Sequence, residues 1–127
     1  AKHEPSLEAQ LREMGRRYVQ FGLDNPAYYR LCFQDTQIAI EALITPQDIT
    51  RMRQSWAVMR DTLQDWVKSV GLQGIDIDQE ANVLWTMVHG ITSLALAGRL
   101  LLSQHDEIFS LYELAVKRWF SGITRPR

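Results

Sequence analysis

Apolar residues recur every three or four positions along most of this chain, and no segment keeps the apolar-polar alternation that a strand requires. The spacing predicts a first helix over Leu7–Asp24, with Ser6 as its N-cap. Pro26 suits the first position of a short second helix that reaches about Phe33, because its fixed φ fits a helix. Residues 34–44 are expected to be helical with irregular ends.

Three longer helices follow in the second part of the chain. Thr45 is predicted to cap a helix over residues 46–70. Asp78 is predicted to cap a long helix that ends near Ser103, and a last helix is expected over Glu107–Phe120. The sequence therefore predicts one all-α domain of five to six helices.

The long helix is apolar almost all round, since residues 81–98 contain no charged side chain. A helix without a polar face must be covered on more than one side. The last helix has the same need, which favours a homodimer in which these two helices form a four-helix bundle across a two-fold axis. The alternative is that the short helices cover this pair within one chain. The candidate dimer-interface residues are Met87, Gly90, Leu94, Ala97, Leu101, Phe109, Val116 and Phe120.

Composition limits the partners that this chain can have. Its 14 basic and 15 acidic residues are interleaved and give a formal net charge of -1, so the chain by itself should bind nucleic acid poorly. Its single cysteine, Cys32, excludes an intramolecular disulfide and fits a reducing, cytoplasmic location. Residues 81–98 reach the length of a membrane span but carry several polar groups, so no membrane segment is expected.

Few residues offer catalytic or metal-binding chemistry. The three histidines form no Glu-x-x-His or His-x-x-x-His pattern, and no glycine-rich loop is present to hold phosphates. We therefore expect no enzyme, no metal site and no cofactor.

His89 and Trp85 lie one turn apart in the middle of the apolar helix. A histidine in such a place is either a hydrogen-bonded core residue or a ligand contact, and the two roles are compatible because the ring has two nitrogens. Methionine and aromatic residues also replace the usual leucines of two other helices, which suits either an ordinary core or the wall of an apolar cavity. The candidate ligand-binding residues are Met14, Tyr18, Trp56, Met59, Trp85 and His89.

The pattern Trp85-x-x-x-His89-Gly90 resembles the motif for which one variant of the TetR-family C-terminal domain is named, and a second block agrees with it. The matching positions of that block are Tyr18, Phe21, Asn25, Pro26, Tyr29, Arg30, Leu31 and Phe33. The resemblance implies that residues 1–127 are the effector-binding and dimerisation domain of a transcriptional regulator. The family's N-terminal helix-turn-helix domain has no counterpart here, and the missing initial methionine fits a fragment.

The resemblance also implies a mechanism. A hydrophobic, aromatic or planar small molecule enters a cavity between the helices, with Trp85 and His89 at its floor, and changes DNA binding by the absent N-terminal domain. Gly90 and Gly98 are expected where helix backbones approach closely. A different class remains open, namely a helical homodimeric scaffold module with a packed interior and no small-molecule ligand.

Overall fold

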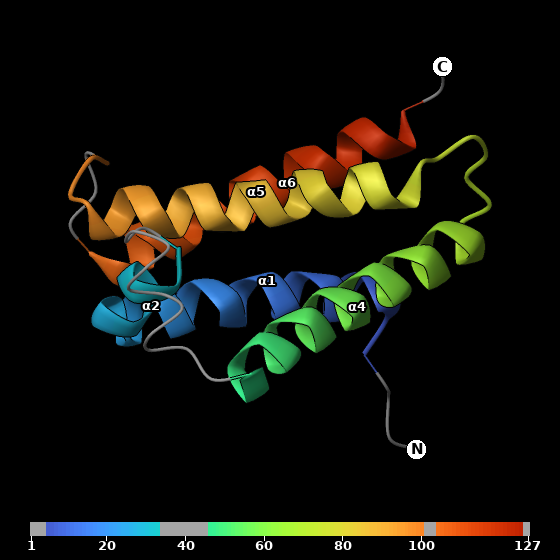
Figure 1. Ribbon diagram of the computed structural model, residues 1–127. Helices are drawn as coiled ribbons and strands as arrows, with labels where there is room; N and C mark the ends of the chain where they lie inside the picture. The colour runs from blue at the N-terminus through green and yellow to red at the C-terminus, as the bar shows by residue number, and fades with distance from the viewer. Residues whose placement is uncertain (1–4, 34–45, 101–103, 126–127) are drawn as a thin grey trace.

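The computed structural model describes residues 5–33, 46–100 and 104–125, and within them the secondary structure is entirely helical (Figure 1). The helices are α1 (Leu7–Asp24), α2 (Pro26–Phe33), α4 (Pro46–Ser69), α5 (Ile77–Leu96) and α6 (His105–Thr124). The predicted all-α fold class is confirmed. The helical segment expected at residues 34–44 and the expected Thr45 cap lie outside the described residues.

Local signals at the chain's turns set the ends of the first helices. The Ser6 hydroxyl accepts a hydrogen bond from the Ala9 backbone N–H at 3.1 Å, which is the predicted cap of α1. Asn25 ends α1 by donating its backbone N–H to the Phe21 carbonyl, and α2 starts at Pro26 as predicted. After α4, Gly71 takes a φ of +71°, a conformation that glycine adopts without strain.

The predicted bounds of α5 were wrong at both ends. Asp76, not Asp78, is the N-cap, and its carboxylate accepts a hydrogen bond from the Gln79 backbone N–H at 3.1 Å. The helix ends at Leu96 because Gly98 adopts a φ of +66°, which stops an α-helix well before residue 103.

The last helix also differs from the prediction. It begins at His105, two residues before the expected Glu107, and Gln104 and Glu107 form a capping box there. It continues past Phe120 to Thr124.

The helices form two layers, with α5 and α6 side by side in one and α1 and α4 in the other (Figure 1). Helix α1 contacts each of the other described helices, so it is the centre of the packing. Its buried side joins an apolar core drawn from both layers. The buried core residues are Leu11, Val19, Leu63, Trp66, Val67, Ala81, Leu84, Val88, Ile108, Tyr112, Val116 and Phe120.

Two glycines of α1 lie at the closest contacts between the layers. A Cβ atom on Gly15 would lie 2.1 Å from the Tyr112 hydroxyl, and one on Gly22 would lie 2.3 Å from the Thr92 methyl group. Gly90 and Gly98, for which a close approach of helix backbones was predicted, make no such contact within the described residues of the single chain. Both have open space where a Cβ would stand, because neither faces a neighbouring described helix.

Two of the residues predicted for the dimer interface are buried within the single chain. Val116 and Phe120 are only 2% and 6% exposed, because the chain's own core already covers this side of α6. Phe109 is partly buried, and the Arg16 guanidinium lies 4.8 Å from its ring centre. Met87 is partly buried as well. Leu101 lies outside the described residues.

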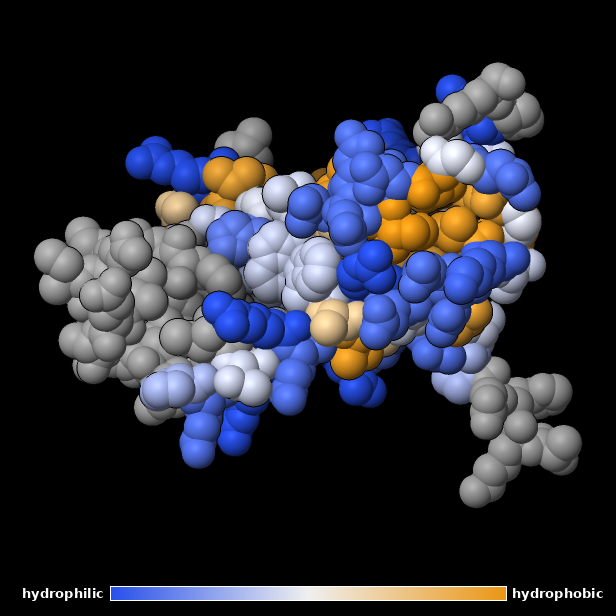
Figure 2. All heavy atoms as spheres, turned by 45° about the vertical axis from the view of Figure 1, so that its right-hand side comes forward, coloured by the Kyte–Doolittle hydropathy of each residue, from blue (hydrophilic) through white to orange (hydrophobic). Residues whose placement is uncertain are grey.

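Several large apolar side chains of the described residues still reach the surface. They are Phe21, Tyr28, Val58, Val70, Val83, Leu94 and Leu114. Figure 2 shows one face of the molecule, on which hydrophobic side chains form a patch between hydrophilic ones in the right half of the view. No described helix is both long enough and apolar enough to cross a membrane.

Candidate ligand-binding site

A cavity of about 970 Å³ lies between the two layers. Helices α1, α4 and α5 form most of its wall, and α2 and α6 contribute the remainder. Its volume is at the upper end of the range of about 300–1,000 Å³ that is usual for small-molecule sites. The fold therefore leaves room for a ligand beside its core.

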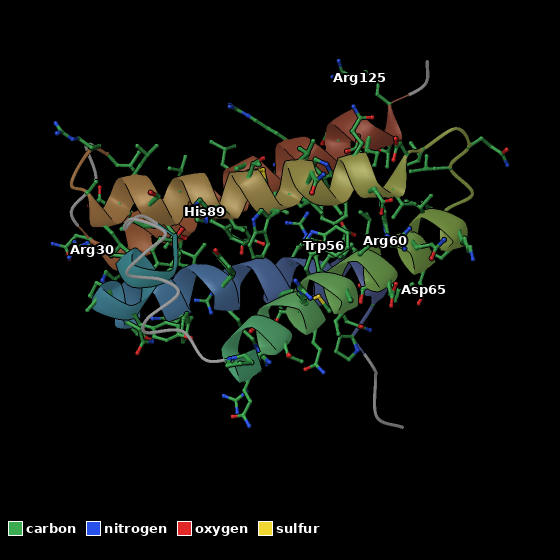
Figure 3. All side chains as sticks on the ribbon, in the orientation of Figure 1. Arg30, Trp56, Arg60, Asp65, His89 and Arg125 are labelled. Carbon is green, nitrogen blue, oxygen red and sulfur yellow. The ribbon has the colours of Figure 1, made fainter. Side chains whose placement is uncertain are left out.

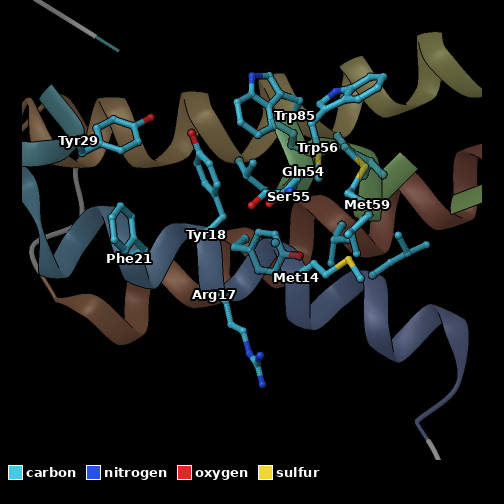
Figure 4. A pocket seen from close by; sticks show the side chains of 18 of the residues that line it. Met14, Arg17, Tyr18, Phe21, Tyr29, Gln54, Ser55, Trp56, Met59 and Trp85 are labelled. Atoms are coloured by element: carbon cyan, nitrogen blue, oxygen red, sulfur yellow. The ribbon is translucent and has the colours of Figure 1, made fainter. Parts of the chain in front are cut away.

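The inner part of the wall is almost entirely apolar. Its buried and half-buried aliphatic, sulfur-containing, phenyl and indole side chains are Leu11, Met14, Trp56, Met59, Leu84, Trp85, Met87, Val88, Val116 and Phe120. Figure 4 shows side chains from α1, α4 and α5 converging on this space. Such a wall favours an apolar occupant because it offers dispersion contacts and few hydrogen bonds.

Five of the six residues that were predicted to bind ligand line this cavity: Met14, Tyr18, Trp56, Met59 and Trp85. Trp85 contacts Tyr18 edge-on, with the ring centres 5.1 Å apart. Met87, which was predicted for the dimer interface, also lies on the cavity wall. His89 is absent from the wall.

The outer part of the wall consists of exposed residues, most of which sequence reasoning missed. They are Arg17, Phe21, Asn25, Tyr28, Arg51, Gln54, Ser55 and Val58. The cavity therefore opens to solvent between α1 and α4. The polar members of this set follow no apolar periodicity, so no signal in the sequence marks them as the rim of a cavity.

His89 points into the space between the layers (Figure 3), where it meets two tyrosines. Its Nδ1 atom lies 3.1 Å from the Tyr18 hydroxyl and 3.0 Å from the Tyr29 hydroxyl. The Tyr29 hydroxyl also lies 3.1 Å from the His89 carbonyl oxygen, to which it can donate. We call these three residues the His89 cluster. It joins α1, α2 and α5 at one end of the cavity.

Burial favours the uncharged forms of His89 and Tyr29. Desolvation lowers the pKa of His89 from its ordinary value of 6.5, because the imidazolium form loses hydration. Desolvation also raises the pKa of Tyr29 to about 12, and a hydrogen bond from Tyr18 opposes part of that rise. A neutral imidazole and neutral phenols can hold hydrogen bonds to each other or to a ligand, but they do not supply a charge.

Tyr29 is the main residue of this site that sequence reasoning did not propose. It is 1% exposed, lines the cavity and carries one of the hydroxyls that contact His89. The neighbouring Arg30 donates a hydrogen bond to the Leu96 carbonyl at 2.9 Å, which gives α2 a second contact with α5. The available signal was that both residues belong to the second motif block.

Within the described residues, no three histidine, cysteine, aspartate or glutamate side chains lie close enough together to hold a metal ion. The described wall of the cavity includes no acidic side chain. The chemistry that the site offers is therefore the non-covalent binding of an apolar molecule, with hydroxyl groups at one end.

Residues 11–118 match the family described as "Tetracyclin repressor-like, C-terminal domain". No curated protein and no solved structure matched the chain. The matched region runs from the first turns of α1 into the last turns of α6 and includes both motif blocks and every described residue of the cavity wall except Phe120. The chain therefore belongs to the family of tetracycline repressor-like C-terminal domains.

Proposed function

We propose that this chain is the ligand-sensing and dimerisation domain of a TetR-like transcriptional regulator, in which an apolar small molecule alters DNA binding by an N-terminal domain. The observation that carries the proposal is the cavity of about 970 Å³ with an apolar inner wall, in a chain of this family. The described residues offer no metal cluster that would favour a different chemistry.

The shape of the side chains supports an aromatic or planar effector. Two indoles, Trp56 and Trp85, and two thioethers, Met14 and Met59, line the inner wall. Indole rings present flat faces for stacking, and methionine side chains adapt to the outline of their neighbour. The Tyr18 and Tyr29 hydroxyls on the wall suit an effector that carries one or two polar atoms, and His89 lies within hydrogen-bond distance of both hydroxyls.

The position of α1 supports a coupling between effector binding in the cavity and the affinity for DNA. This helix carries Met14 and Tyr18 of the cavity wall, and in a regulator of this kind it would be the helix that follows the DNA-binding domain along the chain. In a dimer of helix-turn-helix domains, two recognition helices must lie about 34 Å apart to contact both half-sites. An effector that binds better when α1 holds a different spacing lowers the affinity for DNA, and DNA lowers the affinity for the effector equally.

The outer faces of α5 and α6 support the dimer. Val83 and Leu94 on α5 and Leu114 on α6 are each more than 40% exposed. Gly90 has no neighbouring atom within 4 Å of a Cβ position, and Ala97 is exposed close by on the chain. Small residues beside exposed apolar ones allow two helices to pack closely. This surface is the proposed interface, in place of the buried positions on α6.

A scaffold module with no ligand is the competing function. A module without a ligand is expected to have a closely packed interior, because protein interiors are normally filled by their own side chains. The large cavity favours the sensor. The side chains around an empty space of this size lose van der Waals contacts, which is unfavourable unless a ligand fills the space.

A thermal-shift screen of uncharged aromatic compounds tests the proposal. A compound that binds only the folded chain raises its Tm in proportion to the logarithm of its concentration. We expect Trp56→Ala to weaken the affinity for such a compound about 10-fold or more, because the indole supplies a large contact area. Val70→Ala, a substitution at an exposed apolar residue away from the cavity, should leave the affinity unchanged.

Two results would contradict this function. One is the absence of any stabilising compound in a broad aromatic library, which would favour the scaffold. The other is full affinity in both Trp56→Ala and Trp56→Phe, each shown to be folded by its helical circular dichroism.

A further inference from the structure

Three polar side chains of α4 lie on one side of that helix, where the cavity opens to solvent. Arg51, Gln54 and Ser55 all belong to the cavity wall, and their spacing of three and four residues places them on one face. Trp56 and Met59, which are half-buried, continue the wall further along the helix. Helix α4 therefore offers polar groups at the mouth of the cavity and apolar groups deeper inside, over a rise of about 12 Å.

The polar atoms of this face are not used by the protein itself. Within the described part of the chain, Arg51, Gln54 and Ser55 form no side-chain hydrogen bond or ion pair. The other hydroxyl groups of α4 donate to backbone carbonyls of their own helix; they are those of Thr50, Thr62 and Ser69. The guanidinium, carboxamide and hydroxyl groups of the mouth can therefore bind a molecule in the cavity in exchange for water.

The described wall of the cavity carries positive charge. Its charged members are Arg17 and Arg51, and no acidic side chain is among its described residues. The Arg17 guanidinium forms an ion pair with Glu13 at 3.1 Å and points away from the cavity (Figure 4), so its charge is already balanced. The charge of Arg51 has no such partner among the described residues. A guanidinium has only donor groups, stays charged at neutral pH, and matches the two oxygens of a carboxylate.

We propose that the effector is an aromatic carboxylate, with its ring against Trp56 in the inner part of the cavity and its carboxylate on Arg51 at the mouth. Gln54 and Ser55 lie beside Trp56 on the cavity (Figure 4), and each carries a donor for a carboxylate oxygen. The inference rests on the proposed function, because it requires that the cavity takes up an aromatic molecule. Uncharged aromatic compounds share the ring and are weaker ligands of the same cavity.

Three probes of nearly equal size test it with the 127-residue chain at neutral pH. 2-Naphthoate is an anion, 2-naphthamide has the same outline without a charge, and 2-(aminomethyl)naphthalene is a cation. Calorimetric titration gives the Kd of each probe. We expect the wild type to bind 2-naphthoate most tightly. Added salt should weaken the binding of 2-naphthoate more than that of 2-naphthamide, because ions screen a charge at the mouth of the cavity.

Removal of the Arg51 charge should abolish the preference for the anion. In Arg51→Gln, we expect the affinity for 2-naphthoate to fall about 3- to 10-fold, a range between the effects of an exposed ion pair and of a charged hydrogen bond. The affinity for 2-naphthamide should not change. Arg53→Gln is the matched control, since it removes the same charge two residues away, from a side of α4 that does not line the cavity. Arg17→Gln should also have little effect, because that guanidinium pairs with Glu13.

The possible results are distinguishable. Wild-type affinities for 2-naphthamide or the cation that equal or exceed that for 2-naphthoate would overturn the inference alone, as would equal losses of 2-naphthoate binding in Arg51→Gln and Arg53→Gln. If Arg51→Gln does not fold, a wild-type affinity for 2-naphthoate that is insensitive to salt overturns it. If none of the three probes binds the wild-type chain, the proposed function fails and takes the inference with it.

Discussion

Gly22 determines how closely α1 can approach α5. An added Cβ would lie 2.3 Å from the Thr92 methyl group and 3.2 Å from the Tyr29 ring, and both of these side chains are buried. We expect Gly22→Ala to lower the free energy of unfolding by about 1–3 kcal/mol, the usual cost of overpacking. Urea unfolding followed by circular dichroism measures this. Gly122→Ala, on α6 with open space around it, is the control and should not be destabilising.

His89 should make the stability of the fold depend on pH. Its folded-state pKa is lowered from 6.5 by burial, so the unfolded chain binds the proton first as the pH falls. The stability is therefore present above pH 6.5 and is lost as the pH falls from there through the folded pKa. Measuring Tm between pH 5 and 8 should show this decline in the wild type and a flatter profile in His89→Asn.

The control for the pH profile is His105→Asn, because His105 is exposed at the first position of α6. This variant should keep the wild-type decline. An equal decline in His89→Asn would show that other groups cause the loss of stability.

At the scale of a helix, one side-chain hydrogen bond connects the start of α5 to α6. Glu80 lies in the first turn of α5 and accepts a hydrogen bond from the Trp119 indole at 2.9 Å. Glu80→Ala should lower the free energy of unfolding by about 1–3 kcal/mol, since it removes a charge-assisted hydrogen bond and a favourable interaction with the helix dipole. Gln79→Ala should cost far less, because Asp76 binds the backbone of that residue and not its side chain.

Helix ends were predictable where one capping signal stood alone. Ser6 and Pro26 are such cases, and α1 and α2 have their predicted bounds. Before α5, Asp76 and Asp78 both fit an N-cap, and local sequence does not decide between them. The structure uses Asp76, and Asp78 is then available to accept from Arg60 of α4. That choice depends on a neighbouring helix, which a local pattern does not contain.

At the scale of the whole molecule, the sequence indicated that α5 and α6 must each be covered on more than one side. It did not indicate which side packs against the chain's own core and which side faces a partner chain. Val116 and Phe120 were predicted for the dimer interface because they extend an apolar stripe, yet α1 and the core cover them. The cavity wall was partly predictable, since Met14, Trp56 and Met59 face inward as core residues do. The contact of His89 with Tyr29 joins residues 60 positions apart, and no periodicity reveals it.

The proposed dimer gives a prediction at this scale. Leu94→Asp should raise the dimer dissociation constant about 10-fold or more, because it places a charge at an apolar interface, and it should leave the single chain folded since Leu94 is 47% exposed. Val70→Asp is the matched control, at 49% exposure on the connection between α4 and α5. Sedimentation velocity measures both. A monomeric wild-type chain at micromolar concentration, or equal dissociation in the two variants, would refute the interface.

The four tryptophans are divided between two environments, and this gives the molecule an optical signal of its own. Trp56 and Trp85 line the cavity, whereas Trp66 and Trp119 pack against each other and against Phe120, with the two indoles 5.8 Å apart. Indole emission moves to shorter wavelength when water around the ring is replaced by apolar atoms. An occupant of the cavity would therefore shift the emission of one pair of tryptophans over a steady background from the other, so filling of the cavity can be followed by intrinsic emission without any added dye.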